Sequence, residues 1–176
     1  MAFLVIAYPE IAQADFDWIQ GYRKAHDARY FNVVEPHFTL VFPIADLPRD
    51  AFVAEARRQV EDWPQIPFEI RVATVSHAAA GDIYHEFLVP ETGYASLIKL
   101  HDRLYAGAFA PYLRLDIHFV PHIGIGNGTD AQAAKARVDK LNEDDRRIPG
   151  LIRELSVVEF KDRKITPIER LKLRQA

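Results

Sequence analysis

The chain has 176 residues and no cysteine, and its formal net charge of −3 comes from 22 basic and 25 acidic residues. The lack of cysteine excludes disulfide bonds, thiolate zinc sites and cysteine nucleophiles. Acidic and basic residues are interspersed, whereas a protein that grips long nucleic acid usually carries a basic stripe, so a long duplex is not an expected partner. The longest apolar runs are far below the roughly 20 residues of a membrane helix, and no apolar core with a cleavage site follows Met1. We therefore expect a cytoplasmic protein that does not contact a membrane.

Short apolar runs typical of strands alternate along the chain with stretches of helical periodicity. The first half predicts a strand over residues 3–8, a helix over 15–26 capped by Asp15, a strand over 37–42, a helix over 49–62, and a hairpin of 68–76 with 83–89 whose turn falls at 80–82. The second half predicts a helix over residues 94–109, a strand over 117–125, a helix over 130–142 capped by Thr129 or Asp130, and a hairpin of 154–160 with 165–173. No linker or low-complexity segment interrupts this pattern. The sequence therefore predicts one α+β domain over residues 1–176.

One short pattern occurs twice. Pro36-His37-Phe38-Thr39-Leu40 resembles Pro121-His122-Ile123-Gly124-Ile125, and the two copies lie about half a chain length apart. Each copy falls in a predicted strand, and each strand is followed by a predicted helix. We interpret the repeat as two lobes of similar layout, each of which presents one histidine.

The alternation of side chains along a strand decides which residues accompany each histidine. His37 and Thr39 are predicted to share one face, and His122 and Gly124 are predicted to share another. The apolar residues of the two copies fall on the opposite faces, namely Phe38, Leu40 and Phe42 in the first and Ile123 and Ile125 in the second. The same alternation in the strand over 68–76 sets Phe68, Ile70 and Val72 against Glu69 and Arg71. If the two histidine strands lie side by side at the centre of the fold, their histidine faces border one cleft.

Two imidazoles that face one cleft are suited to acid/base chemistry on a phosphate ester. Histidine titrates near pH 6.5, so neutral and protonated rings coexist near neutral pH. The neutral ring can deprotonate an attacking water or hydroxyl while the protonated ring donates to the departing oxygen, and such transfers typically contribute about 10²–10⁴-fold each. The Thr39 hydroxyl can donate to a non-bridging phosphate oxygen. This chemistry requires no metal and no other cofactor.

The paired motifs His37-Phe38-Thr39-Leu40 and Pro121-His122-Ile123-Gly124-Ile125 resemble those of the 2H phosphoesterase superfamily. That superfamily includes the bacterial 2′-5′ RNA ligase-like proteins and the 2′,3′-cyclic phosphodiesterases, and its pattern is two His-x-Thr/Ser-x motifs in a bilobal α+β fold. Over nearly the whole chain, the resemblance implies antiparallel sheets around a central cleft with helices on the outside. It also implies catalysis by His37 and His122, phosphate binding by Thr39 and Gly124, and a small nucleotide or an RNA end with a cyclic phosphate as the partner.

Gly124 departs from the family pattern, which has threonine or serine at this position. A lost hydrogen bond to a charged group costs about 1.5–3 kcal/mol. A backbone amide could replace the hydroxyl, because glycine permits close approach. Gly124 also favours an alternative interpretation, in which a non-catalytic module of the same fold binds a nucleotide or an RNA end.

A second alternative is a metal-dependent hydrolase that uses His118 and His122, four residues apart, with Asp116. Residues 119–121 are extended in character, and no glutamate accompanies the pair as it does in helical zinc motifs. His118 is otherwise expected at the mouth of the cleft or on the surface.

Other polar residues are candidates for supporting roles. His101 lies on an apolar helical stripe, so we expect it to be buried beside a partner. Arg71, Tyr84 and His85 are candidates for lining a base or phosphate pocket. The sequence does not determine an oligomeric state.

Overall fold

The computed structural model describes residues 1–79 and 81–175. In chain order the elements are β1 (Ala2–Ala7), β2 (Glu10–Ile11), α1 (Gln13–His26), β3 (Phe38–Ile44), α2 (Arg49–Val60), β4 (Ile66–His77), β5 (Tyr84–Thr92), α3 (Tyr94–Leu104), the 3₁₀ helix η1 (Gly107–Tyr112), β6 (Ile123–Gly128), α4 (Ala131–Asn142), β7 (Ile148–Ile152), β8 (Glu154–Lys161) and β9 (Lys164–Lys172). The strands form one nine-stranded sheet in the order β2-β7-β4-β5-β6-β3-β1-β8-β9.

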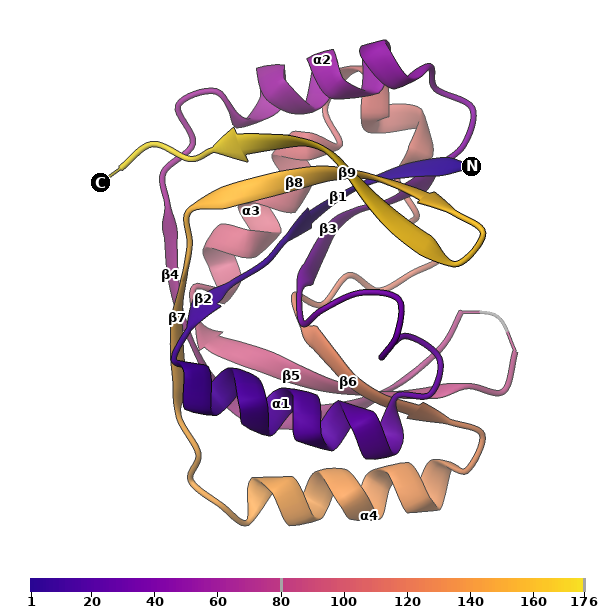
Figure 1. The fold of residues 1–176 in the computed structure, drawn as a ribbon, viewed down its shortest axis with the longest axis vertical. Coiled ribbons are helices and arrows are strands. Elements are labelled where there is room, and N and C mark those ends of the chain that lie inside the picture. Colours follow the sequence, from indigo (N-terminus) through magenta and orange to yellow (C-terminus); the bar gives the residue numbers. More distant parts are fainter. Residues whose placement is uncertain (80, 176) are drawn as a thin grey trace.

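The sheet has two halves that meet at a narrow junction. One half contains β3, β1, β8 and β9, and the other contains β6, β5, β4, β7 and β2. They are joined where β3 pairs with β6, with Phe38 opposite Ile123. Neighbouring strands are antiparallel throughout, and the sheet is strongly curled (Figure 1). The predicted α+β class and antiparallel arrangement are confirmed, and the two sheets expected around a cleft are two halves of one curled sheet.

The helices cover the outside of this sheet. α1 packs on β6, and α4 packs on β4, β5 and β6, so both belong to the half that contains the β4–β5 hairpin. α3 packs on β3 of the other half and also on β4 and β5, so it spans the two halves. α2 contacts α3, β1 and β9. In Figure 1, α1 and α4 lie below β5 and β6, whereas α2 lies at the opposite end beside β9. Among the described residues, none of the helices has the length and apolar character that a membrane span requires.

The buried apolar residues form one cluster that runs through both halves. β1 lies between β3 and β8, and its consecutive residues Val5, Ile6 and Ala7 are all buried, so both faces of the strand are covered. This explains its almost continuous apolar sequence, because a strand covered on both faces needs no polar side. Phe38 of β3 packs edge to face on Phe68 of β4, with ring centroids 5.2 Å apart. This contact crosses the junction, so apolar packing supports the single ladder pair between the halves.

Two helix ends differ from the prediction. α1 begins at Gln13 with Ala12 in the N-cap position, and Asp15 lies in the first turn, where its carboxylate is 3.6 Å from Arg146. The prediction of Asp15 as the cap is therefore wrong, although an acidic side chain in the first turn still favours the helix dipole. α3 ends at Leu104, and the rest of the predicted helix is replaced by a turn and by η1, whose first residue, Gly107, has a φ of 63°. For α4, Asp130 is the cap, and its carboxylate accepts from the Ala133 amide at 2.9 Å.

Two strands contain bulges that shift the alternation of their side chains. In β4 the register against β5 slips at Arg71, so Val72 is 43% exposed and Ala73 is buried. In β3 the register against β1 slips between Thr39 and Val41, and the strand continues past Pro43 to Ile44. The prediction that Val72 faces the core is wrong, because an extra residue reverses the alternation on its far side. The prediction that Pro43 ends the strand is also wrong: the register slips a second time between Val41 and Ile44, and a bulge is a place where a sheet accommodates proline.

Three further differences concern short or irregular segments. The strand predicted over 117–125 begins only at Ile123, so residues 117–122 are an irregular approach to β6. The short strands β2 and β7 were not predicted. The β4–β5 hairpin is confirmed, and Gly81 has a φ of 79° in its turn; Ala80, also predicted in that turn, lies outside the described residues.

Candidate active site

A cavity of about 510 Å³ lies between the two halves of the sheet. Its size falls within the range of about 300–1,000 Å³ that is usual for small-ligand sites. All four residues predicted for the site line it: His37 and Thr39 come from one half, and His122 and Gly124 come from the other. The cleft expected from strand alternation is therefore present. Phe42 also lines this cavity, so its predicted place with Phe38 and Leu40 is wrong, because the bulge in β3 precedes it.

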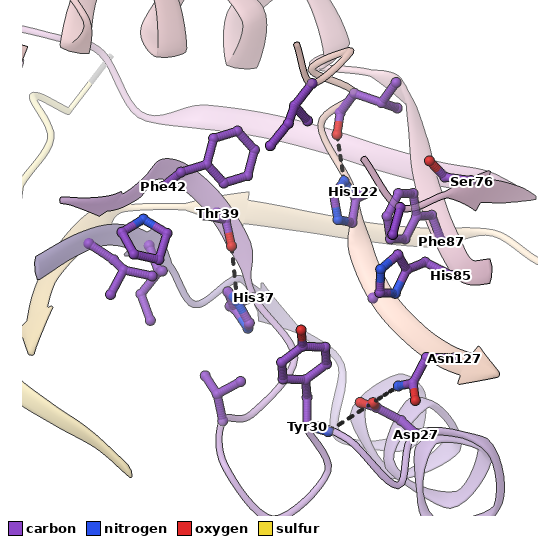
Figure 2. A pocket seen from close by; sticks show the side chains of 18 of the residues that line it. Asp27, Tyr30, His37, Thr39, Phe42, Ser76, His85, Phe87, His122 and Asn127 are labelled. Atoms are coloured by element: carbon purple, nitrogen blue, oxygen red, sulfur yellow. Dashed lines mark hydrogen bonds between the residues drawn. The ribbon is translucent and has the colours of Figure 1, made fainter. Parts of the chain in front are cut away.

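The two histidines have the same local geometry. Each lies just before its strand, and Nδ1 of each ring is bonded to a carbonyl oxygen two residues earlier, Glu35 at 2.8 Å for His37 and Val120 at 2.5 Å for His122. A carbonyl oxygen only accepts, so Nδ1 carries the proton in both neutral rings and Nε2 is the remaining acceptor. Figure 2 shows the two rings on separate strands at the same cavity.

Burial determines the protonation of this pair. It lowers the pKa of His37 to about 4, with a smaller lowering from the positive charge of Arg23. It also lowers the pKa of His122 to about 4, with smaller contributions in the same direction from His37 and His85. In both rings the backbone hydrogen bond opposes the shift. At neutral pH both rings are neutral in the free protein, and an anion between them favours protonation.

Thr39 and Gly124 make the two sides of the cavity different. The Thr39 hydroxyl lies 3.2 Å from Nε2 of His37 and donates to it when the ring has the tautomer described above. On the other side, a Cβ placed on Gly124 would have no atom within 4 Å. Close packing therefore does not explain the glycine, and the space beside His122 accommodates a side chain.

An aromatic stack supports the His122 side of the cavity. Phe87 of β5 lies opposite Gly124 in the sheet, and its ring stacks on His122 with centroids 3.4 Å apart. His85 stacks on the other side of Phe87, with centroids 5.7 Å apart. His85 therefore lines the cavity, as one of the candidates from the sequence. The stack on Phe87 fixes the plane of the His122 ring. The hydrogen bond from Nδ1 to the Val120 carbonyl prevents the ring from rotating within that plane.

The cavity wall also contains buried polar residues that sequence reasoning missed. Arg23 and Asp27 are 1% and 3% exposed, and Asn127 of β6 donates to Asp27. The spacing of Arg23 and Asp27 is typical of an ion pair on a helix, but such pairs usually lie on the surface. Only the packing of α1 against β6 brings this one to the cavity.

The remaining candidates have other contacts. Arg114 binds the Asp116 carboxylate with two hydrogen bonds, of 2.7 and 2.5 Å, and His118 is exposed at the cavity. No group of three or more histidine, aspartate or glutamate residues is placed to hold a metal ion within the described ranges 1–79 and 81–175. The ligand set proposed for a metal-dependent hydrolase is therefore not assembled.

Two other sequence expectations have clear outcomes. His101 is buried and its Nδ1 is bonded to the Leu40 carbonyl at 2.9 Å, which confirms the structural role expected for it. Arg71 pairs with Asp145 and Glu91, and the ring of Tyr84 packs at a tilt against His77. Neither Arg71 nor Tyr84 is among the residues that line the cavity.

The fold is similar to several solved structures. TT0787 of Thermus thermophilus has a TM-score of 0.57 and 16% identity, with 99% of each chain covered. E. coli LigT complexed with 3′-AMP has a TM-score of 0.58 and 16% identity, with 99% of this chain and 98% of that chain covered. Kluyveromyces marxianus Usb1 with uridine monophosphate has a TM-score of 0.54 and 12% identity, with 98% and 96% covered. At these identities the likeness concerns the fold. No curated protein matches the chain.

The family of the chain is shown by a family model, because the solved structures at these identities show the fold alone. The model described as the 2′-5′ RNA ligase superfamily matches residues 9–164, a range that contains both histidine motifs. This match agrees with the resemblance noted for the paired motifs, and it supports a phosphoesterase. The chain therefore belongs to the 2′-5′ RNA ligase superfamily.

Proposed function

We propose that the protein is a metal-independent phosphoesterase that acts on a cyclic phosphodiester at a small nucleotide or an RNA end. The observation that carries this proposal is the pair of half-buried histidines at one cavity, each with Nδ1 bonded to a backbone carbonyl. Because Nδ1 is occupied in both rings, the proton exchange with a substrate takes place at Nε2. Because both rings have the same tautomer, either ring can act as the acid or as the base.

The proposed reaction adds water across one phosphorus–oxygen bond. Nε2 of the neutral ring accepts a proton from the water as its oxygen bonds to phosphorus, and the protonated ring donates its Nε2 proton to the ester oxygen that leaves. The two rings exchange protonation states in one turnover, and solvent restores the initial state. Thr39 donates to a non-bridging oxygen as negative charge grows there, after its hydroxyl has left Nε2 of His37. In a ligation, the hydroxyl of a second RNA end would take the place of water: it loses its proton to the neutral ring as its oxygen bonds to phosphorus, and the same ester oxygen leaves with the proton of the other ring.

Ligands named in the solved structures support a nucleotide-sized substrate. E. coli LigT was crystallised with 3′-AMP and Kluyveromyces marxianus Usb1 with uridine monophosphate. The cavity of about 510 Å³ has room for a ligand of this size. Gly124 favours a second candidate function, a non-catalytic module that binds the same ligands. The glycine lacks the hydroxyl that would donate to the phosphate.

A direct assay separates the two functions. The wild-type protein is incubated with 2′,3′-cyclic AMP in the presence of EDTA, and the nucleoside monophosphates are quantified by chromatography. The enzyme opens the ring at a rate that EDTA does not change. Binding of the nucleotide by calorimetry without any turnover selects the binding module, and loss of turnover on chelation contradicts the metal-independent mechanism.

The pH dependence of kcat/KM follows from the lowered pKa values. Catalysis needs one neutral and one protonated ring, and both pKa values are about 4 in the free protein. Above pH 5 the singly protonated fraction falls about tenfold per pH unit, so kcat/KM is expected to fall steadily from pH 5 to pH 8. The profile of kcat should lie at higher pH, because the bound phosphate anion raises the histidine pKa values. A kcat/KM that rises over this range would contradict the assignment.

A further inference from the structure

Arg23, Asp27 and Asn127 border the cavity but have no role in the proposed proton transfers. Arg23 Nε donates to Asp27 Oδ2 at 2.9 Å, and Arg23 Nη1 donates to Gln20 Oε1 at 2.8 Å. Both charges of the pair are almost fully buried. A buried ion pair is expensive to desolvate and contributes little net stability, which suggests a role other than stabilising the fold.

The hydrogen bonds of this group lead to both histidines. Arg23 Nη2 donates to the Val34 carbonyl at 2.8 Å, next to Glu35, whose carbonyl holds His37. Residues 27–37, a segment without helix or strand, are called the His37 loop. The hydrogen bond from Arg23 to Val34 restricts the movement of this loop. On the other side, Asp27 Oδ1 accepts from the side-chain amide of Asn127 (Figure 2).

Asn127 belongs to β6, the strand that begins directly after His122. The three side chains therefore connect the loop that carries His37 with the strand that follows His122. Among the described residues, the ladder between these two halves of the sheet consists of one pair, Phe38 with Ile123. Apolar packing of α3 and of Phe38 on Phe68 also bridges the halves. The bond from Arg23 to Val34 adds a polar contact that restricts the His37 loop relative to α1 and β6.

We propose that Arg23, Asp27 and Asn127 form a latch that positions His37 relative to His122. The three are positioning residues, because they act through the His37 loop and β6. The proposal rests on the proposed function. A displacement of about 1 Å in a reacting group can cost about 100-fold in rate, so the latch acts mainly on kcat.

The surroundings of His37 supply a second readout. The charged and titratable groups near this ring are Tyr8, with ring centroids 6.3 Å apart, Glu35 on the same loop, the Arg23–Asp27 pair of α1, and His122 across the cavity. Burial is the main reason for the low pKa of His37. When the loop loosens and water reaches the ring, the pKa of His37 rises from about 4 towards its ordinary value near 6.5.

The test compares Asn127→Ala with Asn142→Ala. Asn142 is a matched control, because its side chain bonds the backbone of Ala73 twice, at 2.8 and 2.9 Å, and it does not line the cavity. Compared at the pH where each protein is most active, Asn127→Ala is expected to lower kcat about 10- to 100-fold with little change in KM, and the His37 pKa measured by NMR titration should rise. Asn142→Ala should change neither. Wild-type kcat and His37 titration in Asn127→Ala would overturn the latch.

A negative charge at position 127 tests the hydrogen bond itself. Asn127→Asp places a second carboxylate against Asp27, and the repulsion should lower kcat at least as much as Asn127→Ala does. A wild-type kcat in Asn127→Asp counts against the latch.

These experiments also separate the latch from the proposed function. If the wild type binds 2′,3′-cyclic AMP without turnover, the phosphoesterase proposal fails, but the His37 titration still tests the latch. If the wild type turns over and Asn127→Ala equals it in kcat and titration, only the latch fails.

Discussion

Alanine at His37 or at His122 is expected to lower kcat for 2′,3′-cyclic AMP by about 10²–10⁴-fold, with a much smaller change in KM. In the proposed mechanism each substitution removes one of the two Nε2 atoms that exchange protons with the substrate, while Thr39 and the rest of the cavity wall remain in place. The double variant should be barely slower than the worse single variant, because the two rings act as one unit. Single-turnover assays in EDTA measure these rates.

Alanine at two other histidines controls for a general effect of removing an imidazole. His26 packs on Tyr22, with ring centroids 4.5 Å apart, and His26→Ala should retain wild-type kcat. His118→Ala tests the metal-dependent alternative, which requires both His118 and His122. Equal losses in His118→Ala and His122→Ala would favour that alternative, and activity in either His37→Ala or His122→Ala close to wild type would falsify the acid/base pair.

Gly124→Ser is expected to raise kcat/KM by about 10- to 100-fold, an increase in activity from a single added hydroxyl. The serine Oγ can donate to the phosphate on the side of His122, and a hydrogen bond to a charged group contributes about 1.5–3 kcal/mol. The substitution fits, because an added Cβ meets no atom within 4 Å and the backbone there has no positive φ. Steady-state kinetics with 2′,3′-cyclic AMP measure the change, and Gly124→Thr should act in the same direction.

Gly126→Ser is the matched control two residues further along β6. There a Cβ would lie 2.7 Å from the carboxyl carbon of Glu86, a buried group that Tyr22 and Arg137 hold by hydrogen bonds. Overpacking of this kind costs about 1–3 kcal/mol, so thermal unfolding should shift down for Gly126→Ser and not for Gly124→Ser. An unchanged kcat/KM in a well-folded Gly124→Ser protein would show that another donor already serves that phosphate oxygen.

Most of the fold could be predicted because periodicity is a local property of the chain. The four α-helices, both hairpins and β1 agree with the predicted ranges to within a few residues, apart from the end of α3. Bulges were not predictable, since Arg71 and Leu40 carry no signal for an extra residue in the ladder. β2 and β7 were missed because two and five residues offer too little pattern, and their partners lie far away in the sequence.

The sequence by itself predicted the histidine pair, since a doubled Pro-His motif with matching alternation places His37 with Thr39 on one strand face and His122 with Gly124 on another. Only the tertiary structure decided that the two faces border a common cavity, that Gly124 has open space beside it, and that Arg23 and Asp27 are buried there. The physical reason is that alternation and spacing act along one strand or helix. Burial, and with it the low pKa values of His37 and His122, depends on segments that meet only when the sheet curls.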